Sequence, residues 1–310
     1  MIKRVIIILI ILFALGFSTL VAVPYITTSS MLNVRGDYAE IDAADYGLTA
    51  EEVTLMTDDG LTLAAYLVEA ESPKGVVVLV SGMHNPPVRT FYGYAKMFQD
   101  NGFSTLLVEM RSHGDSEGVG ISMGMNEWLD VKAGAEYIDA LEEYENLPII
   151  AYGTSMGAGT VIIAGANVPE IDAVICASAF TKWSDLVANS MASMGVPKFY
   201  VAIQKPFFDL NLGLRYGLDK MQYTPINEIK KLDKPILLMQ SEDDTQVPYA
   251  CFEALCEAMQ ENDNGEISNL YIYTLAGDYH MICKDEYFEN PIEDAGFSGA
   301  ILSFLSIFGK

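Results

Sequence analysis

Basic residues are scarce in this chain. Its 310 residues include 18 Lys and Arg against 42 Asp and Glu, which gives a formal net charge of −24. An acidic surface of this kind repels phosphate backbones, and no run of basic residues interrupts it. We therefore expect no nucleic-acid partner, and the acidity by itself indicates a well-solvated surface.

Cysteine is also scarce, and its spacing suggests no special chemistry. The four cysteines are Cys176, Cys251, Cys256 and Cys283, and no CxxC pair occurs. Cys251 and Cys256 would lie on different faces of one helix. Neither a metal site nor a disulfide pair follows, so buried free thiols are expected. A location outside the cytoplasm would still permit a bridge.

The N-terminus carries an uncharged apolar run from Val5 to Val23, preceded by Lys3 and Arg4. The run is about long enough to cross a bilayer as a helix, which takes roughly 20 residues. The basic pair before it predicts a cytoplasmic N-terminus and an extracytoplasmic catalytic domain. A secreted protein is the alternative, because Leu20-Val21-Ala22 is a tolerable signal cleavage site. A buried helix of a soluble fold is a third interpretation.

The rest of the chain divides into a short connector and one large domain. Residues 1–27 form the predicted membrane anchor or uncleaved signal, and residues 28–50 are polar and irregular, typical of a stalk. The domain then occupies residues 51–310, without internal repeats or low-complexity tracts.

The domain opens with two alternating runs joined by Asp59-Gly60, which predict a β-hairpin. Short, nearly continuous apolar runs follow, and most are separated by segments of helical period. They cover residues 75–82, 104–110, 148–153, 171–178, 234–241 and 268–277. Strands buried on both faces and alternating with helices predict an α/β fold with a mostly parallel central sheet flanked by helices.

One segment, about residues 181–232, is too long for an ordinary loop in such a sheet. Its Met and aromatic side chains suit a helical lid over a substrate cleft. Met191, Met194 and Phe207 are accordingly candidate substrate contacts. The same side chains would equally serve to seal the insertion onto the core, and both interpretations can hold together.

The stretch Gly153-Thr154-Ser155-Met156-Gly157 follows one predicted buried strand and begins a predicted helix. A serine on such a tight strand-to-helix turn is exposed above the sheet, and Gly153 and Gly157 leave room for it. The first amides of the helix are free to bind an oxyanion. Ser155 is therefore a candidate nucleophile.

A serine nucleophile needs a base, and the chain has three histidines to choose from: His84, His113 and His280. Each follows a predicted buried strand. The base in turn needs an acid to orient it, and Asp243 and Asp244 lie just past the end of another strand. The order Ser…Asp…His is the order found in α/β-hydrolases.

At these motifs the chain, over roughly residues 50–308, resembles the α/β-hydrolase superfamily. It is most similar to the serine hydrolases that include monoacylglycerol lipases, serine aminopeptidases and Bem46-like membrane-anchored members. "GTSMGAG" resembles the nucleophile elbow with Ser155, and "GDYH" resembles the terminal Gly-x-x-His with His280. In the acid-bearing block the resemblance selects Asp244, four residues before the proline. "VEMRSHGDSEG" resembles a further family stretch, with Glu109 and Ser112 as departures.

The resemblance also implies an oxyanion hole. The family usually has His-Gly after the first buried strand, whereas here Ser81 precedes Gly82. The role needs only backbone N–H groups, so Met83 and Met156 can fill it. His84 is a candidate substrate contact or a histidine satisfied by its loop, and His113 is expected to support the site by a hydrogen bond.

We expect a membrane-anchored serine hydrolase that cleaves a lipid-like or small carboxylic ester through Ser155, Asp244 and His280. Amide hydrolysis as in serine aminopeptidases, and acyl transfer, use the same residues and stay open. A non-catalytic binding module on this fold is the alternative of another class. The expected partners are a small acyl substrate and the membrane, with no metal or organic cofactor, and the oligomeric state stays open.

Overall fold

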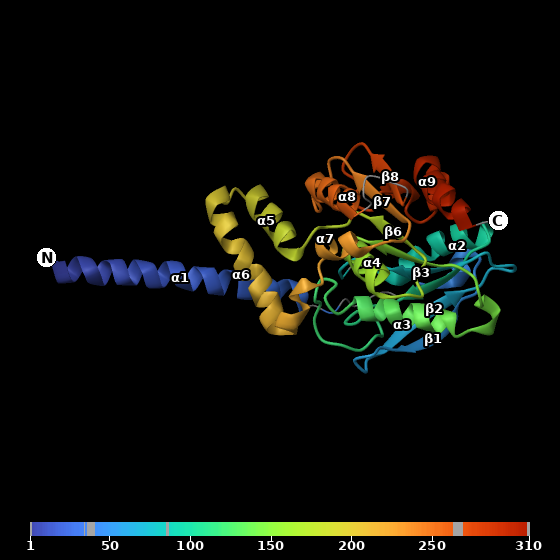
Figure 1. Cartoon of the computed structure of the whole chain (residues 1–310), viewed down its shortest axis with the longest axis horizontal. Helices are drawn as coiled ribbons and strands as arrows, with labels where there is room; N and C mark the ends of the chain where they lie inside the picture. Colours follow the sequence, from blue (N-terminus) through green and yellow to red (C-terminus); the bar gives the residue numbers. More distant parts are fainter. Residues whose placement is uncertain (1, 34, 36–40, 85–86, 263–268, 309–310) are drawn as a thin grey trace.

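The computed structural model describes residues 2–33, 35, 41–84, 87–262 and 269–308. Its centre is an eight-stranded sheet with the strand order β1-β2-β4-β3-β5-β6-β7-β8 (Figure 1). The strands are β1 Glu51–Met56, β2 Thr62–Val68, β3 Val76–Val80, β4 Ser104–Val108, β5 Ile149–Thr154, β6 Ala173–Ala177, β7 Ile236–Ser241 and β8 Leu270–Leu275. Each predicted apolar run coincides with one of the strands from β3 to β8, so the sequence prediction of the sheet is confirmed.

The first two strands form the predicted hairpin, in which Met56 pairs with Thr62. Gly60 in the turn has φ +85°, a conformation that suits glycine. β2 pairs antiparallel with β4, and every pairing from β4 to β8 is parallel. The sheet is therefore mostly parallel, with its antiparallel part at one edge.

Helices cover both faces of the sheet. On one face lie α3 (Trp128–Asp139), α4 (Met156–Asn167) and α8 (Tyr249–Asn262), whose apolar side chains join one core cluster. On the other face α2 (Tyr92–Asp100) and α9 (Ala295–Leu305) join a second cluster. Short 3-10 helices connect them: η1 Ala43–Tyr46, η2 Val88–Phe91, η3 Glu142–Tyr144, η6 Asp285–Tyr287, η7 Pro291–Glu293 and η8 Ser306–Phe308.

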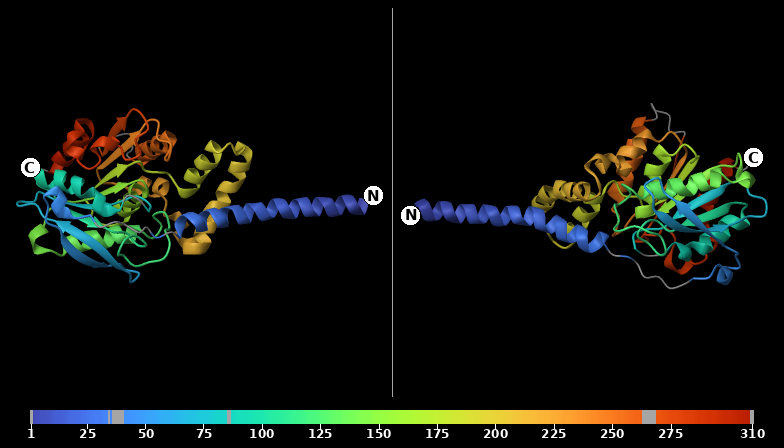
Figure 2. Two further views of the ribbon diagram at one scale, coloured as in Figure 1. Left: turned by 180° about the vertical axis from the view of Figure 1, so that it is seen from behind. Right: turned by 90° about the horizontal axis from the view of Figure 1, so that it is seen from below.

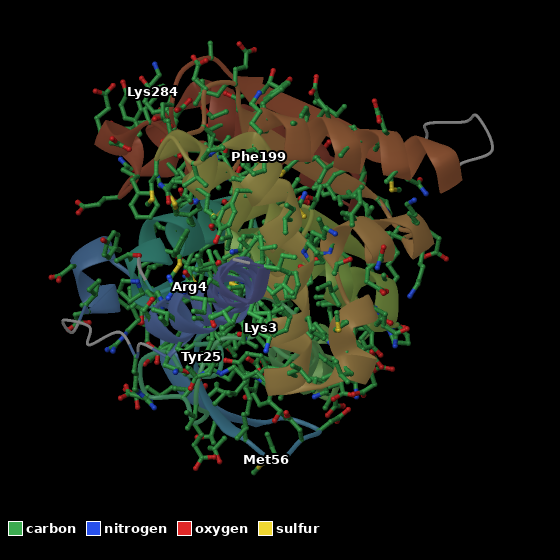
Figure 3. The ribbon with its side chains drawn as sticks, turned by 90° about the vertical axis from the view of Figure 1, so that its left-hand side faces the viewer. Lys3, Arg4, Tyr25, Met56, Phe199 and Lys284 are labelled. Carbon is green, nitrogen blue, oxygen red and sulfur yellow. The ribbon has the colours of Figure 1, made fainter. Side chains whose placement is uncertain are left out.

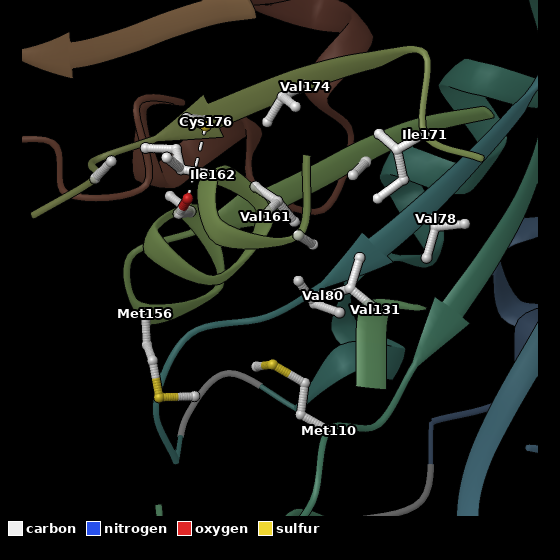
Figure 4. Close-up of a cluster of buried hydrophobic side chains, with 14 of the residues drawn as sticks. Val78, Val80, Met110, Val131, Met156, Val161, Ile162, Ile171, Val174 and Cys176 are labelled. Atoms are coloured by element: carbon white, nitrogen blue, oxygen red, sulfur yellow. Dashed lines mark hydrogen bonds between the residues drawn. The ribbon is translucent and has the colours of Figure 1, made fainter. Parts of the chain in front are cut away.

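The first core cluster contains Cys251 and Cys256, which lie in α8, and Cys176 of β6, which lies beside α4. Figure 4 shows Cys176 among buried aliphatic side chains, with its thiol 3.6 Å from the carbonyl oxygen of Ala158. All four cysteines are buried and unbridged, as expected from their spacing. Burial raises the pKa of the Cys256 thiol to about 11, which favours its protonated form.

A helical insertion separates β6 from β7, where the sequence predicts one. It consists of α5 (Trp183–Ser193), α6 (Lys198–Tyr216), η4 (Leu218–Gln222), α7 (Pro225–Glu228) and η5 (Ile229–Lys231). Figures 1 and 2 show α5 and α6 standing away from the sheet, on the side where the N-terminal helix projects. α6 packs against that helix.

The N-terminal helix α1 runs from Ile2 to Leu32, beyond residue 27 and into the predicted stalk. Among the helices of the described residues, it is the one long and apolar enough to cross a membrane by length and composition. Among the described residues of its most apolar 18-residue window, none is buried against protein. A membrane anchor and a signal sequence both fit this observation. Of the rest of the predicted stalk, residues 34 and 36–40 lie outside the described residues.

Candidate active site

Ser155 occupies the turn between β5 and α4, with φ +54° and ψ −116°. This backbone conformation is strained for a residue with a side chain. The turn is tight because backbone crosses backbone on both sides of the serine. A Cβ on Gly153 would lie 2.2 Å from the carbonyl oxygen of Gly157, and one on Gly157 would lie 2.5 Å from that of Ser81. Larger residues therefore cannot replace either glycine without moving the turn.

Asp244 and His280 meet at the neighbouring strand ends, Asp244 after β7 and His280 after β8. Asp244 Oδ2 lies 2.9 Å from Nδ1 of His280. The other carboxylate oxygen accepts backbone N–H bonds from Gln246 at 2.8 Å and Val247 at 2.9 Å. Burial disfavours the charge of Asp244, but the hydrogen bond and charge of His280 and these amides outweigh it. The pKa of Asp244 is therefore held below its ordinary value.

The loop that carries His280 is fixed by the end of β6. The Ser178 hydroxyl, just after that strand, donates a 2.6 Å hydrogen bond to the backbone carbonyl of His280. Asp243, the neighbour of Asp244, instead has its backbone amide bonded to Gly277 at 2.9 Å. The structure thus brings Asp244, and not Asp243, to the histidine ring.

The loop after β3 lies against the serine. A Cβ on Gly82 would be 3.3 Å from the Cβ of Ser155, and the next residue, Met83, lines the same cavities as Ser155. Met156 is the first residue of α4 and is 1% exposed, with its side chain in the core cluster of Figure 4. Met156 also lines the apolar cavity beside Ser155.

His113 holds the end of this loop. Its Nε2 accepts a 3.1 Å hydrogen bond from the backbone amide of His84, and its Nδ1 lies 2.9 Å from the carbonyl oxygen of Arg111. Since a carbonyl only accepts, the proton of the neutral ring belongs on Nδ1. Burial lowers the pKa of His113, which favours this neutral form.

Two cavities meet at Ser155 and His280. The first, of about 420 Å³, is mainly apolar and is lined by side chains of α1, α5 and the loops around the serine. The second, of about 460 Å³, is more polar than the first and includes Asp278 and Asp285. Cavities of this size suit small-molecule ligands. The arrangement offers an apolar and a polar compartment on either side of one serine.

The candidate substrate contacts fall into two groups. Met191 and Met194 line the apolar cavity. Phe207 lies in α6. Neither Phe207 nor His84 is among the described residues that line the two cavities. The ring of His84 instead meets the carbonyl oxygen of Met31 at the end of α1. Within the described residues, no group of three His, Cys, Asp or Glu side chains could hold a metal ion.

Three further cavity residues come from α1, where the sequence predicts only an anchor and a stalk. Val23, Thr27 and Met31 line the apolar cavity beside Ser155. Their spacing of four residues places them on one helix face, and this spacing is the signal that the sequence offers. The polar composition of residues 28–50 obscures it, because it is typical of irregular structure.

The fold is shared with known hydrolases. The structure of the Pyrococcus furiosus esterase Pf2001 superposes with a TM-score of 0.71 at 20% identity, covering 89% of this chain and 98% of the esterase. The family model described as serine aminopeptidase, S33, matches residues 71–208, which include Ser155. The chain therefore has the α/β-hydrolase fold.

Two curated proteins are also similar to this chain. It is 27% identical to the Bacillus subtilis protein YqkD over 221 residues, which are 68% of this chain and 71% of YqkD. It is 26% identical to the human protein ABHD12B over 202 residues, which are 61% of this chain. The match spans about half, 51%, of the length of ABHD12B.

Proposed function

We propose that this α/β-hydrolase is a membrane-anchored serine hydrolase that cleaves a carboxylic ester by way of an acyl-enzyme. The observation that carries the proposal is the 2.9 Å pair of Asp244 and His280 in one site with the strained Ser155. Nucleophile, base and acid at the ends of three strands of one sheet are the parts that nucleophilic acyl transfer needs.

In the proposed mechanism, His280 Nε2 takes the proton of Ser155 Oγ as that oxygen attacks the acyl carbonyl carbon. The carbonyl oxygen becomes an oxyanion, which the amides of Met83 and Met156 stabilise. Asp244 stabilises the imidazolium that forms. The intermediate then expels the alcohol, which takes the proton from His280, and water releases the acid by the same steps. The proposed steps need no metal or organic cofactor.

The two cavities support an assignment of the two halves of the substrate. The apolar cavity would hold the acyl chain, and the polar cavity with Asp278 and Asp285 would hold the alcohol. Carboxylates beside the alcohol disfavour an anionic leaving group. Under this proposal α1 stays attached, with its N-terminus in the cytoplasm and the domain on the other side. A secreted form cleaved after Ala22 is the competing outcome.

The test combines a covalent probe with an activity profile. A fluorophosphonate should label the wild-type protein and fail to label Ser155→Ala. We expect hydrolysis of p-nitrophenyl esters by the wild type only, at rates well above those on aminoacyl-arylamides. An ester rate that survives in Ser155→Ala contradicts the mechanism. A preference for the arylamides would favour the aminopeptidase named by the family model, and a folded wild type without label or activity would favour a binding module.

A further inference from the structure

The last three turns of α1 belong to the folded domain. Pro24, Thr28 and Leu32 are buried, and their spacing of four residues puts them on one helix face. The carbonyl oxygen of Leu32 accepts a 2.8 Å hydrogen bond from the amide of Ile121. Farther up the helix, the side-chain amide of Gln204 in α6 donates to the carbonyl oxygen of Thr19 at 3.3 Å. This end of α1 is therefore docked on the domain, whereas the described side chains of residues 2–11 are exposed.

The docked end also forms part of the cavity that contains Ser155. The apolar cavity is lined by the residues that immediately precede the three buried residues of this helix end, namely Val23, Thr27 and Met31. Val23 and Thr27 are half-buried there. Leu186, Val187 and Met191 of α5 line the same cavity. An acyl chain bound to Ser155 would thus lie between α1 and α5.

If α1 spans the membrane, the turns of α1 that line this cavity lie at the membrane surface. Its 31 residues span about 46 Å at 1.5 Å per residue, whereas the hydrocarbon core is about 30 Å thick. With residues 2–19 in the membrane, the docked turns lie at the membrane surface. Apolar side chains of the insertion are exposed on the same side of the molecule, where Figure 3 labels Phe199. Met194 is 82%, Phe199 70% and Leu214 68% exposed.

The charge of the insertion fits the same location. Residues 181–232 contain seven Lys and Arg but four Asp and Glu, although acidic residues outnumber basic ones 42 to 18 in the whole chain. A segment with a positive net charge and exposed apolar side chains suits a lipid surface better than the acidic remainder of the chain does.

From these contacts we propose that Val23, Thr27 and Met31 select the acyl chain, and that the substrate is a long-chain acyl ester drawn from the bilayer along α1. The inference rests on the proposed ester hydrolysis at Ser155. It makes the N-terminal helix a specificity-determining element of the enzyme in addition to its anchor.

The test uses the full chain in phosphatidylcholine vesicles with p-nitrophenyl acetate, butyrate, laurate and palmitate. The wild type should prefer laurate or palmitate to acetate. In Thr27→Trp the laurate-to-acetate rate ratio should fall by about tenfold or more, because pocket contacts with a few methylenes are worth that much. Thr27→Ala should shift the preference toward palmitate. The matched control is Ile26→Trp, at a position that is 63% exposed and outside the cavity lining.

The outcomes separate this inference from the proposed function. An unchanged ratio in both Thr27 variants, with normal acetate hydrolysis and normal fluorophosphonate labelling, overturns the role of α1 and leaves the hydrolase intact. A wild type that prefers acetate in vesicles overturns the lipid substrate. A wild type that neither labels nor hydrolyses any ester instead contradicts the proposed function itself. Since Thr27→Ala only removes atoms, it remains informative if Thr27→Trp does not fold.

Discussion

The backbone amide of His84 donates a hydrogen bond to Nε2 of His113, and the imidazole must be unprotonated at that nitrogen to accept it. His113 is 3% exposed. The bond ties the loop that carries Met83 to the loop after β4. The protonation state of the buried His113 ring therefore determines whether this bond holds the loop that carries the Met83 amide, the proposed oxyanion donor.

The first prediction concerns pH. Burial lowers the pKa of His113 in the folded protein, so the unfolded chain binds the proton more readily. The neutral ring of His113 therefore contributes its full share to the free energy of unfolding above the pKa of the unfolded chain, about 6.5. This contribution is lost as the pH falls below that value, by up to about 1.4 kcal/mol per pH unit. The free energy of unfolding, measured with denaturant at about pH 7.5 and at about pH 5.5, should fall less between the two pH values in His113→Gln than in the wild type. An equal loss in both proteins contradicts a buried neutral His113.

The second prediction distinguishes two neighbouring aspartates. Asp244→Asn removes the charge beside His280 and should lower kcat on p-nitrophenyl esters by an order of magnitude of about 10⁴, as loss of a triad acid does elsewhere. Asp243→Asn is the matched control and should stay within about twofold of the wild type, because the described contact of Asp243 is made by its backbone. Equal losses of kcat in the two variants would contradict a triad role for Asp244, because they would mean that both aspartates only maintain the structure of the loop.

The third prediction tests whether Met83 acts through its backbone. Met83→Pro removes the N–H group and should lower kcat on p-nitrophenyl acetate by about 10²- to 10³-fold. Met83→Ala keeps the amide, so its rate on acetate should stay within about twofold of the wild type. The result that counts against an oxyanion role is a similar rate in both variants, with circular dichroism confirming that both are folded.

The fourth prediction concerns stability. In Gly153→Ala the new methyl group would lie 2.2 Å from the carbonyl oxygen of Gly157. Backbone on both sides cannot give way easily, so we expect the free energy of unfolding to fall by about 3 kcal/mol. The control is Gly299→Ala in α9, where nothing lies within 4 Å. That change should raise stability by about 0.5–1 kcal/mol in denaturant titrations, since alanine favours a helix over glycine.

The sheet could be predicted because its strands are buried on both faces. Runs such as Val76–Val80 are apolar without alternation and too short for a helix, which is typical of the inner strands of a parallel sheet. The meeting of Asp244 with His280 could be anticipated for a related reason. Parallel strands end at one edge, so residues that follow neighbouring strands come together whatever their separation in the sequence.

The position of α1 beside the cavity could not be predicted in this way. A helix face that points to lipid and one that points to a cavity can both be apolar. The four-residue spacing of Val23, Thr27 and Met31 therefore indicates a shared face but not what that face contacts. Its position depends on α6, far along the chain, and on the amide of Ile121. Phe207 illustrates the same limit, because the direction of a side chain within a helical insertion depends on packing that periodicity alone does not fix.

The order of the strands has a consequence for the biosynthesis of this chain. β7 and β8 are the last strands to leave the ribosome, and they form one edge of the sheet. Asp244 follows β7 and His280 follows β8, so the two residues that pair in the site are also made late. A chain that has emerged only as far as α6 already contains Ser155 but has no partner for it. Under the proposed function, the chain would stay inactive during its synthesis and would become active only after His280 has emerged and paired with Asp244.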